Sequence, residues 1–69
     1  MNRYLIILEP TSTGFSAYSP DLLGCVATGD TKEETETHMR EAIEFHLEGM
    51  KEEGYAVPHP QCLPAFCEV

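Results

Sequence analysis

The chain has 69 residues and a formal net charge of −8, from twelve acidic side chains against four basic ones. A chain this short forms one domain and buries only about 60% of the surface that it exposes when unfolded, so we expect a homodimer to supply further buried area. The charge argues against direct binding to nucleic acid, because each phosphate contact needs a cation, and it favours a basic protein partner unless it serves only solubility.

The N-terminal stretch lacks the features of a targeting or membrane segment. Residues 5–8 are a run of only four apolar residues, and Glu9 and Pro10 end it. A signal peptide needs a basic start and a longer apolar run, and a membrane helix needs about 20 apolar residues. The sequence therefore predicts a soluble, cytoplasmic protein that binds no membrane.

The first part of the chain predicts three antiparallel strands. Residues 3–9 are rich in strand formers and suit a first strand. Residues 15–19 alternate large apolar with small or polar residues, and the loop at 10–14 joins them to the first strand as a hairpin. After a turn at 20–24, residues 25–28 return as a third strand. The result is a meander with one face to be covered.

A helix start follows the third predicted strand. Thr31 and Glu34 form a capping-box pattern, in which the Thr31 hydroxyl accepts from the Glu34 amide and Glu34 reaches back. Residues 32–53 then predict one amphipathic helix of about six turns, and Gly54 ends it. The apolar side of this helix, which is expected to cover the sheet, consists of Thr35, Met39, Ala42, Ile43, His46, Leu47 and Met50.

The opposite side of the predicted helix is acidic. Glu44 and Glu48 form a like-charge pair four residues apart, as do Glu48 and Glu52, and each pair costs a few tenths of a kcal/mol. Retaining this repulsion fits docking to a basic surface, and solubility explains it almost as well. Phe45 lies beside this side as a candidate exposed aromatic, and the alternative is that it reaches the core or a dimer contact. The residues that we expect to bind a partner are Glu41, Glu44, Phe45, Glu48 and Glu52.

The end of the chain, residues 55–69, carries three prolines that exclude a helix and confine any strand to a sheet edge. We expect a short last edge strand at 62–66. The prediction is thus a single α+β domain over residues 1–69, with its core in 3–54, a proline-rich tail after it, and the element order β-β-β-α-β.

Cysteine and histidine raise the question of a metal site. The ligand types are His59, Cys62 and Cys67 in the tail, with Cys25, His38 or His46 to complete a tetrahedral set. The closely paired ligands typical of structural zinc sites are missing, so we expect no metal and no cofactor. The cysteines are instead expected to be reduced and to pack, with Cys25 in the core, and the helix glutamates to be solvated rather than catalytic.

In combination, these segments resemble the HicB family of antitoxins, which are partners of HicA-type mRNA-cleaving toxins. The resemblance covers about residues 4–60. The matching segments are Y-L-I-I-L (4–8), G-F-S-A-Y (14–18), S-P-D-L-L-G-C (19–25), G-D-T (29–31), E-E (33–34), E-A-I-E (41–44), H-L-E-G-M (46–50), Gly54 and P-H-P (58–60). The signature residues that we expect to shape the fold are Pro20, Asp21, Leu22, Gly24, Cys25, Gly29, Asp30 and Thr31.

The resemblance implies the same meander and covering helix, described as a degenerate RNase H-like fold. It also implies binding to a small basic toxin of double-stranded-RNA-binding-domain type, occlusion of the toxin's catalytic histidine surface, and no enzymatic activity. Leu23 stands where the family usually has Pro, and Lys32 where it has an apolar residue. Many members add a C-terminal DNA-binding domain, and this chain is expected to be the N-terminal HicB-like domain without one.

Two other functions stay open. One is a stand-alone interaction or regulatory module without a toxin, which would use the same sheet edge and helix face. The other is a metal-dependent nuclease retained from an RNase H-like ancestor. That activity would require Asp21, Asp30 and a helix glutamate to converge on a metal ion.

Overall fold

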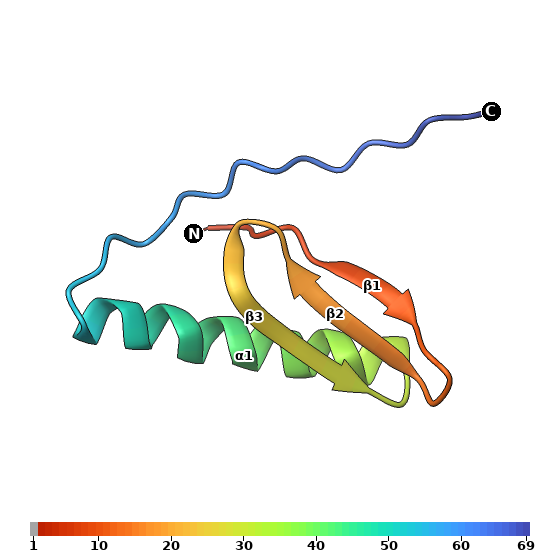
Figure 1. The fold of residues 1–69 in the computed structure, drawn as a ribbon, viewed down its shortest axis with the longest axis horizontal. Coiled ribbons are helices and arrows are strands. Elements are labelled where there is room, and N and C mark those ends of the chain that lie inside the picture. Colours follow the sequence, from red (N-terminus) through yellow and green to blue (C-terminus); the bar gives the residue numbers. More distant parts are fainter. Residues whose placement is uncertain (1) are drawn as a thin grey trace.

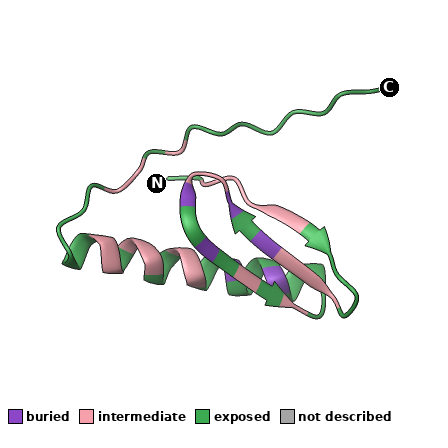
Figure 2. Cartoon of the chain, in the orientation of Figure 1, coloured by how far each residue is buried: buried purple, intermediate pink, exposed green. Residues whose placement is uncertain are grey.

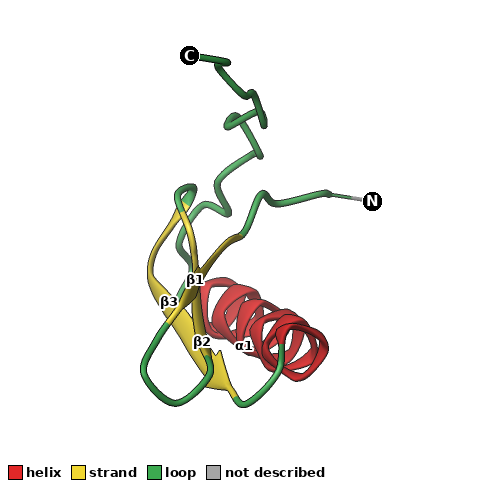
Figure 3. Cartoon of the chain, turned by 90° about the vertical axis from the view of Figure 1, so that its right-hand side faces the viewer, coloured by secondary structure: helices red, strands yellow, loops and turns green. Residues whose placement is uncertain are grey.

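Three strands and one helix make up the regular structure of the computed structural model, which describes residues 2–69. The elements are β1 (Ile7–Pro10), β2 (Phe15–Ser19), β3 (Leu22–Gly29) and α1 (Lys32–Glu52). The sheet has the order β1-β2-β3 with antiparallel neighbours, and α1 lies along one face of it (Figures 1 and 3). The predicted α+β meander with one covering helix is confirmed.

The strand register places small and aliphatic residues opposite one another beneath the helix. Leu8 lies opposite Ala17, and Ala17 lies opposite Ala27. Side chains alternate between the two faces of a sheet, so these three share the face toward α1, where Ala17 is buried in the core and the other two pack against it. Ile7 and Tyr18 form the adjacent pair and belong to the opposite face.

Two strands differ from their predicted bounds. β1 begins only at Ile7 rather than at residue 3, and β3 begins at Leu22 rather than at residue 25. The cause in β3 is that Leu22 pairs with Ser19 across a two-residue turn, so the strand starts before Gly24. The register then shifts, and Gly24 takes a φ of +79° inside this irregular stretch instead of in the turn. Such an irregularity bends the strand and re-aims its side chains.

The core lies between the sheet and the apolar side of α1. Among the residues described, the buried hydrophobic side chains are Ala17, Leu22, Cys25 and Met39. Figure 2 shows the buried positions along β2, β3 and the first half of α1. Every residue predicted for the apolar side of the helix is buried or half-buried, as the period of 3.6 residues requires. No helix in residues 2–69 is sufficiently long and apolar to span a bilayer.

The tail after α1 contains no strand within residues 53–69, so the short edge strand expected at 62–66 is not present. Three prolines interrupt the tail and remove backbone donors that a strand ladder would need. The Gln61 and Cys62 amides donate instead to the Asp21 carboxylate, each at 3.2 Å. The tail runs past the N-terminal segment, where the Tyr4 hydroxyl donates to the Pro58 carbonyl (Figure 1). Cys62 and Cys67 are exposed, so their predicted packing is wrong.

Candidate protein-binding surface

A row of exposed glutamates forms the solvent side of α1. On a helix with 3.6 residues per turn, Glu41, Glu44, Glu48 and Glu52 lie with Phe45 inside an arc of about 100°. All five are exposed, and Phe45 is exposed over 80% of its surface. These residues are called the acidic face below. The alternative that Phe45 reaches the core is wrong, because most of its side chain is exposed to solvent.

Phe45 also borders a groove that runs between β3 and the C-terminal half of α1. This β3–α1 groove has a volume of about 480 Å³. Val26 contributes to its wall from β3, Phe45 and Gly49 from α1, and Tyr55 from the segment after the helix. Val26 and Tyr55 are each 65% exposed, so the groove presents an apolar surface to solvent.

The charge around the β3–α1 groove is negative. Its lining includes Glu52 and Glu53, and no Lys or Arg among the residues that the structure describes. Two other grooves differ in this respect. One lies between the N-terminal segment and α1, has a volume of about 490 Å³ and includes Arg40 together with Glu36 and Glu44. The other lies between the N-terminal segment and the tail and includes Arg3.

Gly49 leaves the β3–α1 groove open on its helical side. A Cβ atom built on Gly49 would meet no atom within 4 Å, so the space above this position is empty. We did not predict Gly49, Val26 or Tyr55 as site residues. The sequence feature that could have indicated this site is a glycine inside the predicted helix, four residues after a candidate exposed aromatic. The groove itself forms only when β3 and Tyr55 lie beside the helix.

Cys25 forms a buried part of the same groove. Its position in the core confirms the prediction from sequence. Burial raises the pKa of the Cys25 thiol, because desolvation disfavours the thiolate. Since the thiolate is the reactive form of cysteine, the burial of Cys25 and this pKa shift both favour a packing role.

Asp21, expected only to shape a turn, also holds the tail. Its carboxylate accepts from the backbone of Cys62 and Gln61, about forty residues further along the chain. The Cys62 amide is the main reason that the pKa of Asp21 lies below its ordinary value, with the Gln61 amide adding to it. A hydrogen bond to the Asp21 carboxylate in turn raises the pKa of the Cys62 thiol.

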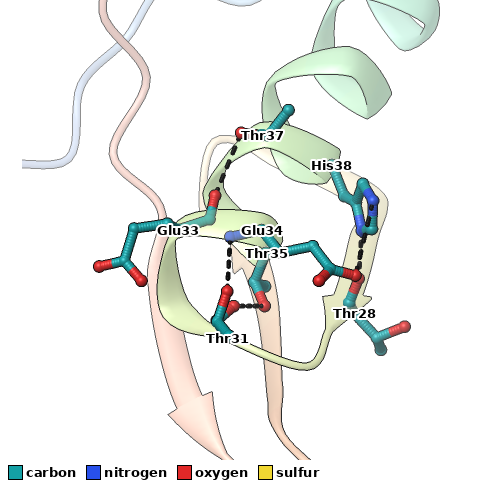
Figure 4. A network of polar contacts seen from close by, with 7 residues as sticks. All are labelled: Thr28, Thr31, Glu33, Glu34, Thr35, Thr37 and His38. Carbon is teal, nitrogen blue, oxygen red and sulfur yellow. Dashed lines mark hydrogen bonds and ion pairs between the residues drawn. The ribbon is translucent and has the colours of Figure 1, made fainter.

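The start of α1 is fixed by a network of short polar contacts (Figure 4). Thr31 Oγ1 accepts from the Glu34 amide at 3.1 Å, as the capping pattern predicted. The Glu34 carboxylate extends toward His38, with Oε1 4.0 Å from Nε2, instead of reaching back to Thr31. His38 Nδ1–H donates to the Thr28 carbonyl at 2.7 Å, and Thr35 Oγ1 donates to the Thr31 carbonyl at 2.7 Å. These bonds tie the first turns of α1 to the end of β3.

Asp21 and Asp30 do not converge on a metal site. Asp21 immediately precedes β3 and Asp30 immediately follows it, so an eight-residue strand separates them, on the order of 20 Å. The tail residues His59 and Cys62 are exposed. Within residues 2–69 no three His, Cys, Asp or Glu side chains are grouped so as to hold a metal ion. The carboxylate arrangement that the nuclease hypothesis requires is therefore not formed by these two aspartates.

Comparison with known proteins shows which family the sequence and fold match. A family model described as HicB_like antitoxin of bacterial toxin-antitoxin system matches residues 4–68. An uncharacterised 14.9 kDa protein in the rep-hol intergenic region of Haemophilus phage HP1 is 40% identical over 55 residues, which is 80% of this chain and 41% of that protein. UPF0150 protein ssr1765 of Synechocystis sp. is 39% identical over 57 residues, which is 81% of this chain and 72% of that protein.

Two solved structures share the fold. A chain of a structure titled HicA3 and HicB3 toxin-antitoxin complex has a TM-score of 0.76 and 34% identity, covering 88% of this chain and 71% of that one. The crystal structure of the antitoxin HicB3 has a TM-score of 0.73 and 34% identity, covering 88% of this chain and 45% of that one. This chain thus spans less than half the length of the phage protein and of the HicB3 crystal chain.

Proposed function

Because this chain belongs to the HicB-like antitoxin family of bacterial toxin–antitoxin systems, we propose that it binds a small basic HicA-type toxin and neutralises it. The observation that carries the proposal is the acidic face of α1 with its exposed aromatic. The proposed contact residues are Glu41, Glu44, Phe45, Glu48 and Glu52, since they lie together on one side of the helix and are all exposed.

Electrostatics supports a basic partner. The net charge of −8 attracts a cationic protein over a distance and speeds encounter. Glu44, Glu48 and Glu52 repel one another at spacings of four residues, and neighbouring cations on a partner would relieve that repulsion. Phe45 would add apolar contact area at the edge of this charged surface, and aromatic residues are enriched at the energetic centres of interfaces.

Neutralisation by this mechanism is stoichiometric. The chain would cover the catalytic histidine surface of the toxin and so exclude mRNA, while performing no reaction and binding no nucleic acid itself. We also propose that it acts as a homodimer, since its core is small. The RNase H-like origin implied by the family resemblance stays a prediction.

The test is co-expression of the chain with a small basic HicA-type toxin. We expect the two proteins to purify together and the chain to restore growth that the toxin arrests. A toxin that neither co-purifies nor loses its toxicity would overturn the proposal and favour a stand-alone interaction module.

A matched pair of variants tests the acidic face. We expect E44Q/E48Q/E52Q to weaken toxin binding about tenfold or more at low salt, mainly through slower association. The control E9Q/E36Q/E68Q removes the same charge from other exposed positions and is expected to bind nearly as wild type. Equal loss in both variants would show that only the net charge matters.

A further inference from the structure

Several features that lower stability meet at the β3–α1 groove. Gly49 is a poor helix former placed inside α1. Glu52 and Glu53 lie at the C-terminal end of the helix, where the helix dipole disfavours negative charge. Phe45 and Tyr55 expose large aromatic surfaces to water. Residues that lower the stability of the fold and cluster at one place are typical of functional sites.

The shape of the groove suits an inserted side chain. Its volume is about 480 Å³, and the position above Gly49 is empty out to 4 Å. Val26 bounds it from the strand, and Phe45 and Tyr55 contribute apolar surface. An apolar pocket with aromatic sides, bordered by charged groups, is the arrangement that surrounds the buried anchor residues of protein interfaces.

The negative charge of the groove indicates that a partner segment with basic residues binds there. Glu52 and Glu53 line it without a Lys or Arg among the described residues, whereas one of the other grooves has Arg40 beside Glu36 and Glu44 and the other has Arg3. A second copy of this chain would bring another net charge of −8 toward the same glutamates, so the proposed homodimer is expected to use a different surface. A segment with an apolar residue flanked by cations is complementary to both the surface and the charge.

We propose that the β3–α1 groove receives an apolar anchor side chain of the basic toxin, with neighbouring Lys or Arg side chains paired to Glu52 and Glu53. This inference rests on the proposed function and extends it, because it places the energetic centre of the interface in the groove. The other glutamates of the acidic face, which are Glu41, Glu44 and Glu48, then steer the toxin toward the groove and form the charged rim.

The decisive variants fill the groove without damaging the fold. Gly49→Leu places a side chain in the empty space, and Leu is also a much better helix former than Gly. We expect it to raise the Tm by a few degrees and to weaken toxin binding about a hundredfold. Gly49→Ala is the matched control, expected to raise the Tm similarly while binding within about threefold of wild type. Both quantities are measured by calorimetry on the purified chain and toxin.

The outcomes separate the two proposals. If the wild-type chain binds no toxin, the proposed function fails. If wild type binds and Gly49→Leu binds equally well, the groove inference fails and the proposed function stands. A Gly49→Leu variant that turns a wild-type dimer into a monomer with unchanged toxin affinity would also overturn the inference, since the groove would then be a contact between copies.

A second comparison does not depend on filling the groove. We expect E52Q/E53Q to weaken toxin binding about tenfold or more and to flatten its salt dependence, because two groove charges are lost. The control E9Q/E68Q removes two charges from outside the groove. Equal affinities of the two double variants would contradict the pairing of toxin cations with Glu52 and Glu53.

Discussion

Two of the signature residues, Gly24 and Gly29, are glycines for different physical reasons. Gly24 has a φ of +79°, which side chains with a Cβ adopt only with strain. Gly29 does not have a positive φ, so its role is not to allow a left-handed backbone conformation. A Cβ on Gly29 would lie 2.6 Å from Thr35 Oγ1 and 2.9 Å from the Thr35 amide nitrogen. Gly29 is therefore required because the strand and the helix approach closely.

A series of alanine substitutions tests these roles in the free energy of unfolding. We expect Gly29→Ala to destabilise by about 2 kcal/mol through overpacking, and Gly24→Ala by about 1 kcal/mol through backbone strain. Gly49→Ala should stabilise by up to about 1 kcal/mol, because its site is open and helical. Urea denaturation measures all three. A Gly29→Ala variant as stable as wild type would contradict the close approach.

At the scale of elements, the least regular part of the chain is held by few bonds. The tail is anchored where the turn before β3 presents the Asp21 carboxylate to the Gln61 and Cys62 amides. A second bond runs from the Tyr4 hydroxyl to the Pro58 carbonyl. Val57, Pro58 and Pro60 are half-buried, whereas the tail from Gln61 onward is exposed, so the docking of that last part depends on these hydrogen bonds rather than on burial.

The docking of the tail should depend on pH through Asp21. Its folded-state pKa is lowered, because the Cys62 and Gln61 amides favour the ionised form. The stabilisation is therefore fully present above the ordinary value of about 3.9 and is lost as the pH falls through the lower folded-state value. NMR shifts of the two amides should report this loss in acid. In the Asp21→Asn variant the shifts of the two amides should show no transition in acid, and they should already indicate a weakened contact at neutral pH. Amide shifts identical to those of wild type at pH 7 would contradict the role of Asp21 in holding the tail.

At the scale of the whole molecule, the chain combines a small core with a large charge. Among the residues described, only Ala17, Leu22, Cys25 and Met39 are buried hydrophobic side chains. Large apolar side chains such as Leu23 and Phe66 are exposed. Association with a second copy or with a partner would cover some of this surface, and anything that binds only the folded chain stabilises it.

The proposed homodimer predicts a concentration-dependent thermal transition. Because dimerisation removes folded monomer by mass action, we expect the Tm to rise by several degrees over roughly a hundredfold increase in protein concentration. Scanning calorimetry measures this, and light scattering gives the mass in solution. A constant Tm together with a monomer mass at the highest concentration would contradict the dimer.

Local chemistry explains which predictions from sequence held. The helix predicted at residues 32–53 nearly matches α1, because the 3.6-residue apolar period and the Thr31 cap are local features of the sequence. The bounds of β3 were missed because they depend on the pairing of Ser19 with Leu22 and on the register shift that follows. The register of a hairpin is set jointly by the turn and by the side chains of both strands, so no propensity of a single residue contains it.

The amino-acid sequence by itself determined the α+β class, the apolar and acidic sides of the helix, the burial of Cys25 and the family resemblance. Each of these follows from periodicity, composition or short motifs. Only the tertiary structure decided that Asp21 holds the tail and that Phe45 and Gly49 border a groove with Val26 and Tyr55. Those relations join segments that are far apart in the chain, and they exist only once β3, α1 and the tail are packed together.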